Sequence, residues 1–383
     1  MSFAKVFVGG DVVNYHQEDG KVIDKDLEAI IQGAGLSVCN FEAPVAGSGK
    51  PILKSGPHHC QLPNTVDGLK EQGFDVLLLA NNHIMDYGPE GLRATIERAK
   101  FANIETLGAG LCSQAAYQPL IKDVEGLKVG MLNACEAQFG VLDYFQPESE
   151  AGYAWINHRY IDEQVLKLKQ TCDYVIVFSH AGLEHYHIPQ KEWRARYKHL
   201  CNLGADAVIG SHPHVPQGYE RHKESVIFYS LGNFYFDSKN YIHKKDSTYS
   251  VVLRLGKKGK SVDFDVVHHY KDGGKTKLAP AVERVNLEEL NEMLAPAKYQ
   301  KLHDEMSSSS YNKIIKNFRV SVASGWYTGD FPQSLKSLIK KHLLNRKAAD
   351  KETLQLHLLR NEAYYFAARH ALELRYQGKV PHE

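Results

Sequence analysis

The sequence has few cysteines and no long apolar segment, and both absences narrow the class of protein. Its six cysteines are scattered and form no Cys-x-x-Cys pair, so we expect reduced, mostly buried thiols rather than a disulfide framework or a cysteine metal site. No window reaches the apolar length of a membrane span. The first residues enter a strand pattern without a basic segment, an apolar stretch and a cleavage site, which favours a cytoplasmic location.

The chain also lacks an excess of charge of either sign. Lysine and arginine total 46 against 45 acidic residues, so no overall field favours nucleic acid or an anionic membrane, and we predict no nucleic-acid partner. The glycines at 108 and 110 are too isolated to form a dinucleotide-binding fingerprint. The sequence contains no internal repeat, so the ligand has to be inferred from local groups of side chains.

The pattern of apolar segments predicts an α/β fold with a helical extension. Strand-like and helix-like segments alternate from residue 3 to about residue 237, which is typical of α/β proteins whose ligands collect beyond the carboxyl ends of the strands. The most apolar segment, 74–80, has the composition of a central strand covered on both faces. Segments 249–255 and 262–269 predict a closing β-hairpin. With 383 residues, we expect a main domain over 1–275 and a helical extension over 276–383.

The extension is expected to be helical but interrupted. Helical spacing of apolar residues breaks at the serine run 307–310 and again at 324–330, and resumes at 335–343. A long helix is expected to begin at Asp350. Its apolar stripes indicate packing surfaces rather than a chemical site.

The abundant residue of chemical interest is histidine, of which the chain has 20. An apolar segment ending near Ile209 is followed by Gly210, which we expect to turn the chain sharply, and then by His212 and His214 around Pro213. Two imidazoles fixed at a strand exit can each bind a metal ion. On its own the pair could equally make ordinary hydrogen bonds.

The same arrangement recurs after five other predicted strands. The polar residues at these strand ends are Asp11, Glu42, Asn82, His83, His180, His212 and His214. Two carboxylates, an amide and four imidazoles without a thiolate suit Mn, Fe or Zn and do not choose between them. A carboxylate can bridge two ions, and such a pair of ions can hydrolyse a phosphoester.

Simpler structural roles are open to each of these side chains. Asp11 and Glu42 could cap the helices that follow them. The role of His83 could be limited to a hydrogen bond with a neighbouring residue. Glu184 could contact a substrate or support other residues from outside the site. Asn233 suits a turn better than a metal ion.

Six motifs in a fixed order give these residues a family context. They are GD, NFE, ANNHIMDYG, SHAGLE, GSHPHV and SLGNF, between about residues 3 and 237. In this order they resemble the bacterial capsule-synthesis family (CapA, poly-γ-glutamate), which is itself similar to calcineurin-like metallophosphoesterases. The resemblance implies an α/β/β/α sandwich, and it does not extend beyond about residue 275.

The resemblance also implies roles for individual residues. Asp11 and His214 would bind a first divalent ion, Glu42 would bridge two ions, and Asn82, His180 and His212 would bind the second. His83 would be the catalytic histidine that protonates the leaving oxygen or stabilises charge, and Asp86 would orient it. Asn40, Glu184 and Asn233 are possible additional site residues.

One feature departs from the broader phosphoesterase pattern and keeps other functions open. Val13 stands where a histidine usually follows the first aspartate by two residues, so the first ion would have fewer protein ligands. The leading prediction is a metal-dependent phosphoesterase acting on a phosphorylated small molecule or polymer precursor. The alternatives are a non-catalytic capsule or polymer-assembly factor, and an amide hydrolase with two metal ions.

Overall fold

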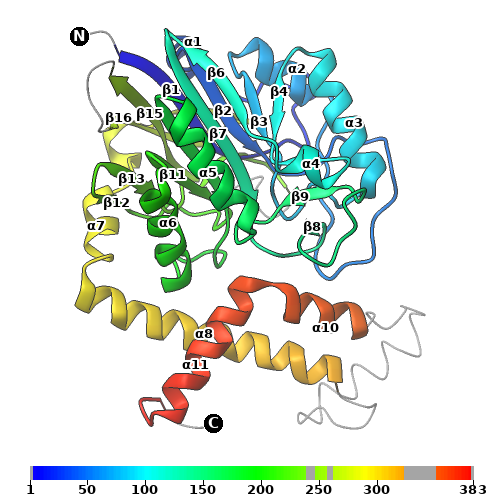
Figure 1. The fold of residues 1–383 in the computed structure, drawn as a ribbon, viewed down its shortest axis with the longest axis vertical. Coiled ribbons are helices and arrows are strands. Elements are labelled where there is room, and N and C mark those ends of the chain that lie inside the picture. The colour runs from blue at the N-terminus through cyan, green and yellow to red at the C-terminus, as the bar shows by residue number, and fades with distance from the viewer. Residues whose placement is uncertain (1–2, 239–245, 257–261, 323–350, 381–383) are drawn as a thin grey trace. The chain divides into compact units, whose positions relative to one another are not determined.

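The computed structural model describes residues 3–238, 246–256, 262–322 and 351–380 (Figure 1). It separates into two compact units. The first comprises Met1–Ile52 and His58–Tyr299, and the second comprises Leu53–Pro57 and Gln300–Glu383. The boundary expected between 275 and 276 falls within strand β17 (Lys275–Leu278), which pairs with the strand before it.

The larger sheet of the first unit has eight strands among the described residues. Their order is β17-β16-β15-β1-β2-β3-β4, with β14 paired to β1. Strands β14, β1, β2, β3 and β4 are parallel to one another, and β15 to β17 add antiparallel pairs, as the predicted hairpin required. The remaining bounds are β1 Phe3–Val13, β2 Leu36–Phe41, β3 Val76–Leu78, β4 Glu105–Leu107, β14 Asn233–Phe236, β15 Ser247–Gly256 and β16 Asp263–Asp272.

The second sheet has six strands in the described part of the chain, in the order β12-β13-β11-β10-β7-β6. Strands β7, β10, β11 and β13 are parallel to one another. The bounds are β6 Leu120–Val124, β7 Leu127–Cys135, β10 Tyr174–His180, β11 Ala207–Ser211, β12 Tyr219–His222 and β13 Ser225–Phe228. A small third sheet joins β5 (Ala109–Gly110), β9 (Gly152–Ala154) and β8 (Val141–Leu142).

Successive side chains of a strand point to opposite faces of its sheet, so each large sheet can pack on the other sheet with one face and on helices with the other, which gives four layers. On β1, Val6 and Val8 belong to the apolar core between the two large sheets, whereas Phe7 packs in the core with the helices on the other face. Helices α5 and α6 cover the second sheet (Figure 1). The α/β/β/α sandwich predicted from the sequence is therefore confirmed.

The helices of this unit are α1 Lys25–Gln32, α2 Asn64–Glu71, α3 Gly88–Phe101, α4 Ser113–Ala116, α5 Arg159–Thr171, α6 Lys191–Leu203, η1 Ala281–Glu283 and α7 Leu287–Glu292.

Two local predictions in this unit were wrong. The segment 74–80 is buried, but its strand β3 covers only Val76–Leu78 and lies next to the end of the sheet, between β2 and β4. Gly210 does not turn the chain, because it lies inside β11. A Cβ there would stand 2.1 Å from the Tyr229 carbonyl oxygen, so the glycine permits close approach of two backbones.

The described C-terminal residues are helical, as predicted, but the break expected at the serine run is absent from them. Helix α8 (Pro296–Val322) runs through the serine run without interruption, and Ser307 and Ser310 are buried in it. The helix expected from Asp350 is two helices, α10 (Lys351–Arg360) and α11 (Glu362–Tyr376), because Asn361 caps the second by accepting from the Tyr364 amide. The features expected at 324–330 and 335–343 lie outside the described residues.

None of the helices in the described ranges combines the length and the apolar character that crossing a bilayer requires.

Candidate metal centre

The first site residue lies at an irregularity in β1. The register of β1 against both β2 and β14 shifts at Asp11, and such bulges redirect a side chain. The backbones are tightly packed here, since a Cβ on Gly10 would stand 1.9 Å from the Gly232 carbonyl oxygen. Asp11 is completely buried, and its Oδ1 accepts a 2.7 Å hydrogen bond from Nδ2 of Asn40 on β2.

The next residues follow the ends of the neighbouring parallel strands. Glu42 comes directly after β2 and is fully buried. Asn82 and His83 lie in the turn after β3, and both are at least nine-tenths buried. The larger sheet thus directs two carboxylates, an amide and an imidazole toward one edge.

His180, the last residue of β10, connects the edges of the two large sheets. Its Nδ1 lies 3.1 Å from Asn40 Nδ2 and 3.1 Å from Ser211 Oγ. Its Nε2 lies 3.1 Å from Asn82 Oδ1 and 3.1 Å from His212 Nδ1. Since Asn40 and Asn82 belong to the larger sheet, the carboxyl ends of both sheets meet at this imidazole.

His212 and His214 follow β11 in a strained backbone. Their φ angles are 97° and 59°, a left-handed region that residues other than glycine rarely occupy and that recurs at functional sites. The conformation brings the His212 amide within 3.3 Å of Asp11 Oδ2. It also places His214 Nδ1 3.0 Å from Asn233 Oδ1, and Asn233 Nδ2 donates to Asp246.

The donor atoms fall into two groups that share one carboxylate. The first group is Asp11, Glu42 and His214, and the second is Glu42, His180 and His212. Glu42 Oε1 lies 3.7 Å from His180 Nε2 and 3.8 Å from His214 Nε2. Within each group the ligand atoms lie within 4.8 Å of one another, a spacing that a bound ion could bridge after small side-chain shifts.

Burial sets the protonation of these groups. Burial lowers the pKa of His180 well below 6.5, and the neighbouring His212, His214 and His83 lower it further. Burial likewise lowers the pKa of His212 to about 4. Burial raises the pKa of Asp11, against the opposing effect of His214. His180 and His212 are therefore neutral at pH 7, the form of imidazole that binds metal ions.

The side chains fit divalent cations. Asn40 Oδ1 is buried and receives no hydrogen bond from any residue within the described ranges, and a buried amide oxygen without a donor is costly unless a cation satisfies it. Carboxylate, amide and imidazole groups without a thiolate suit Mn, Fe and Zn. Asn40, which the sequence suggested only as an additional ligand, thus both orients Asp11 and offers a free oxygen.

His83 lies beside these groups and is held by a second network. Its Nδ1 lies 2.7 Å from Asp86 Oδ2, which also accepts from the His59 amide at 2.7 Å. The His59 ring packs edge-on against that of His83, with 4.4 Å between centroids, and its Nδ1 hydrogen-bonds the Tyr15 hydroxyl. Because Asp86 engages Nδ1, it fixes the orientation of the His83 ring.

Sequence reasoning missed a buried carboxylate at the site. Glu136 follows β7 directly; its Oε2 accepts from the Gly182 amide at 2.9 Å, and its Oε1 lies 3.7 Å from His212 Nε2. The signal was a polar residue after a strand, as at the other positions. The apolar pattern of the sequence predicts a strand over 127–133, which ends two residues before the observed end at Cys135, so Glu136 did not stand out as a residue at a strand end.

Glu184 is more exposed than these donors but interacts with them, because His214 and His212 lower the pKa of its carboxyl against the opposing effect of desolvation. It lies in the loop after β10, its side chain is 46% exposed, and its carboxylate lies 3.9 Å from His185 Nε2. This position suits contact with a ligand entering from solvent better than a buried support.

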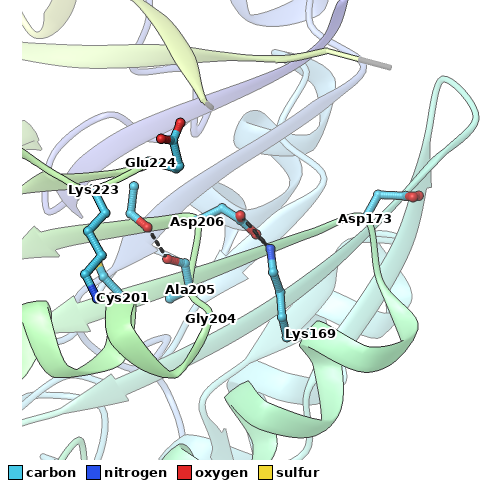
Figure 2. A pocket seen from close by; sticks show the side chains of 9 residues that line it. Lys169, Asp173, Cys201, Gly204, Ala205, Asp206, Lys223 and Glu224 are labelled. Atoms are coloured by element: carbon cyan, nitrogen blue, oxygen red, sulfur yellow. Dashed lines mark hydrogen bonds and ion pairs between the residues drawn. The ribbon is translucent and has the colours of Figure 1, made fainter. Parts of the chain in front are cut away.

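A separate cavity lies at the opposite edge of the second sheet (Figure 2). It has a volume of about 420 Å³, and its lining includes residues just before β10 and β11 and the first residue of β13. Figure 2 shows Lys169 reaching Asp206, with Nζ 2.6 Å from Oδ1. The residues that line the cavity include none of the predicted site residues, so the chemistry is to be sought at the carboxyl edge.

Comparison with known proteins places these residues in a family context. The chain is 32% identical over 244 residues to the capsule biosynthesis protein CapA of Bacillus anthracis, covering 62% of this chain and 58% of that protein. It is 30% identical over 223 residues to the PGA biosynthesis protein CapA of Bacillus subtilis (strain 168), covering 58% of each. The chain thus spans a little over half the length of these relatives.

Solved structures of similar fold include the calcineurin-like phosphoesterase YfkN from Bacillus subtilis. That match has 15% identity and a TM-score of 0.41, and it covers 79% of this chain and 98% of that one. The family of the bacterial capsule synthesis protein PGA_cap matches residues 6–238, a range that holds every predicted site residue. The resemblance inferred from the six motifs is therefore confirmed, and the chain belongs to the bacterial capsule synthesis protein PGA_cap family.

Proposed function

We propose that this chain is a metal-dependent phosphoesterase that uses two divalent ions at the edge where its sheets meet. The observation that carries the proposal is the pair of buried donor groups sharing Glu42, next to the His83–Asp86 pair. Two ions would stabilise the charge on phosphoester oxygens and make a water molecule nucleophilic at neutral pH.

The proposed division of ligands follows the two groups. Asp11 and His214 would hold one ion, and His180, His212 and Asn82 the other, with Glu42 between them. Asn233 fixes the His214 ring through Nδ1, so that Nε2 faces Glu42 at 3.8 Å. The burial of Asp11, His180 and Glu42 excludes water from the donor atoms and strengthens their electrostatic interactions.

His83 would act on the substrate rather than on the ions. With Nδ1 engaged by Asp86, its Nε2 can donate a proton to the leaving oxygen or stabilise negative charge in the transition state. Asp86 is a positioning residue, since it fixes the ring without facing the substrate. His59 packs on the same ring and limits its rotation.

One observation favours a second candidate function, a non-catalytic factor that binds a capsule polymer. Val13 is completely buried where a further histidine ligand would be expected, so the first ion would have fewer protein ligands and weaker binding. The names of the relatives from Bacillus anthracis and Bacillus subtilis refer to capsule or PGA biosynthesis and not to hydrolysis.

The decisive experiment measures turnover of the full chain with defined metals. Protein stripped with a chelator is reloaded with Mn²⁺, Fe²⁺ or Zn²⁺ and assayed on p-nitrophenyl phosphate, bis-p-nitrophenyl phosphate and a γ-glutamyl peptide. We expect phosphoester hydrolysis with at least one metal, reduced about 100-fold or more in His83→Ala and Asp11→Ala.

A control variant and two alternative outcomes separate the candidate functions. His199→Ala, which changes a half-exposed histidine on α6, is expected to keep wild-type activity. Absence of turnover with every metal, together with binding of poly-γ-glutamate, would favour the polymer-binding factor. Release of amine from the peptide without phosphoester turnover would favour the amide hydrolase.

A further inference from the structure

A second group of metal-binding side chains lies in the helical unit, well separated along the sequence from the family motifs. His303 and Asp304 are on α8, and His370 is on α11, which lies against α8 (Figure 1). One ligand atom from each of the three residues lies within 4.8 Å of the other two. The apolar stripes of these helices had indicated packing surfaces only.

His370 lies on the buried face of α11. His370 shares its face with Ala363, Ala367, Ala371 and Leu374, all of which are buried. His370 is the one polar side chain among these buried residues of α11, and it contacts Asp304 of α8.

Both imidazoles are buried between the helices. His303 is 2% exposed and His370 is 7% exposed, and their rings pack edge-on with 4.6 Å between centroids. Neutral imidazole is the form that binds a metal ion.

The surrounding carboxylates complete the arrangement. Asp304 Oδ1 accepts from His370 Nε2 at 2.6 Å and from Gln300 Nε2 at 2.7 Å. His370 Nδ1 lies 3.9 Å from Glu373 Oε2, one turn further along α11. Metal-binding histidines commonly have one nitrogen toward the ion and the other toward a carboxylate.

We infer that His303, Asp304 and His370 form a second metal site, which binds Zn²⁺ or a similar divalent transition ion and joins α8 to α11. Two imidazole nitrogens and one carboxylate oxygen suit Zn²⁺, which takes tetrahedral sites with nitrogen and oxygen ligands. The Asp304 side chain is 28% exposed, so solvent reaches the site and water can supply the fourth ligand. This inference does not depend on the proposed phosphoesterase activity.

The test counts zinc ions bound by the full chain. Chelator-stripped protein is titrated with Zn²⁺, and the bound metal is measured by elemental analysis after removal of free ions. We expect the double variant His303→Gln/His370→Gln to bind one ion fewer than wild type. His357→Gln, on α10 and outside this group, is the matched control and is expected to bind the wild-type number.

A second pair of variants makes the result decisive. Asp11→Asn/His214→Gln alters the first unit and is expected to retain zinc in the helical unit. Asp304→Asn keeps an oxygen that can accept from His370, so the fold is preserved, but a neutral amide binds zinc at least tenfold more weakly. Wild-type stoichiometry in the double histidine variant, or unchanged zinc affinity in Asp304→Asn, would show an ordinary hydrogen bond and overturn the inference.

Discussion

Nδ1 of His83 lies 2.7 Å from Oδ2 of Asp86, three residues further along the chain. Asp86 is 1% exposed and also accepts from the His59 amide, so its position is fixed from two sides. The pair gives His83 one tautomer and one ring orientation before any substrate binds.

Replacing Asp86 with asparagine should reduce kcat more than KM. The amide keeps the size of the side chain but removes the charge that stabilises a protonated His83, so we expect kcat on a phosphoester to fall about tenfold or more. Full pH–rate profiles should show the limb assigned to His83 moving to lower pH. An unchanged profile would mean that Asp86 only shapes the turn.

Replacing Glu42 should affect metal binding more broadly than replacing either flanking histidine. Glu42 belongs to both donor groups, whereas His214 and His212 belong to one each. We expect Glu42→Gln to lower the binding affinity for both ions at least tenfold, and His214→Gln to lower the affinity for one of them. Calorimetric titration with Mn²⁺ measures this difference, and equal losses in the two variants would argue against a shared carboxylate.

Gly10→Ala should destabilise the protein and disturb Asp11. The added Cβ would stand 1.9 Å from the Gly232 carbonyl oxygen, so two backbones must separate, at a cost of about 2–3 kcal/mol. Gly33→Ala is the control, since its nearest atom would lie at 3.2 Å. Urea unfolding compares the two variants, and similar losses would contradict the close approach of β1 to β14.

His269 should make the protein sensitive to acid. It is buried between Thr248 Oγ1 at 3.2 Å and Ser250 Oγ at 2.9 Å, and burial, with a smaller effect of His268, lowers its pKa to about 3. Since the folded-state pKa is below the unfolded value of 6.5, its stabilisation is complete above pH 6.5 and is lost as the pH falls toward 3.

The measurement is the free energy of unfolding at two pH values. Between pH 7.5 and pH 5 we expect wild type to lose about 2 kcal/mol through this residue, and His269→Gln to be spared that loss. His199→Gln, half-exposed on α6, should lose as much as wild type. Equal pH dependence in all three proteins would assign the acid sensitivity to other groups.

Most of the site residues that could be predicted from the sequence follow the ends of predicted strands. Parallel strands end at a common edge, so polar residues after apolar segments identified Asp11, Glu42, Asn82, His180 and the two histidines after β11, which the structure brings together. Their roles as ligands stay predictions. The α/β class was predictable from the alternation of strands and helices, whereas the sandwich was implied by the family resemblance of the six motifs.

The parts that escaped prediction depend on tertiary contacts. Gly210 was taken for a turn because no local pattern reveals that the Tyr229 backbone lies against it. Glu136 was missed because an expected strand end was off by two residues, within the usual error of such boundaries. The group formed by His303, Asp304 and His370 was not predicted, because His303 and His370 lie 67 positions apart in the sequence. The apolar residues of their segments suggested only packing.

The meeting of two sheets at His180 has a consequence for how the centre forms. Its donors come from segments between Asp11 and Asn233 and from both halves of the sandwich, so neither half folded alone contains a complete set. With ions bound as proposed above, cation affinity would therefore measure whether the two sheets are packed together. Mild denaturation that loosens the interface should release bound ions while the helices and strands still persist.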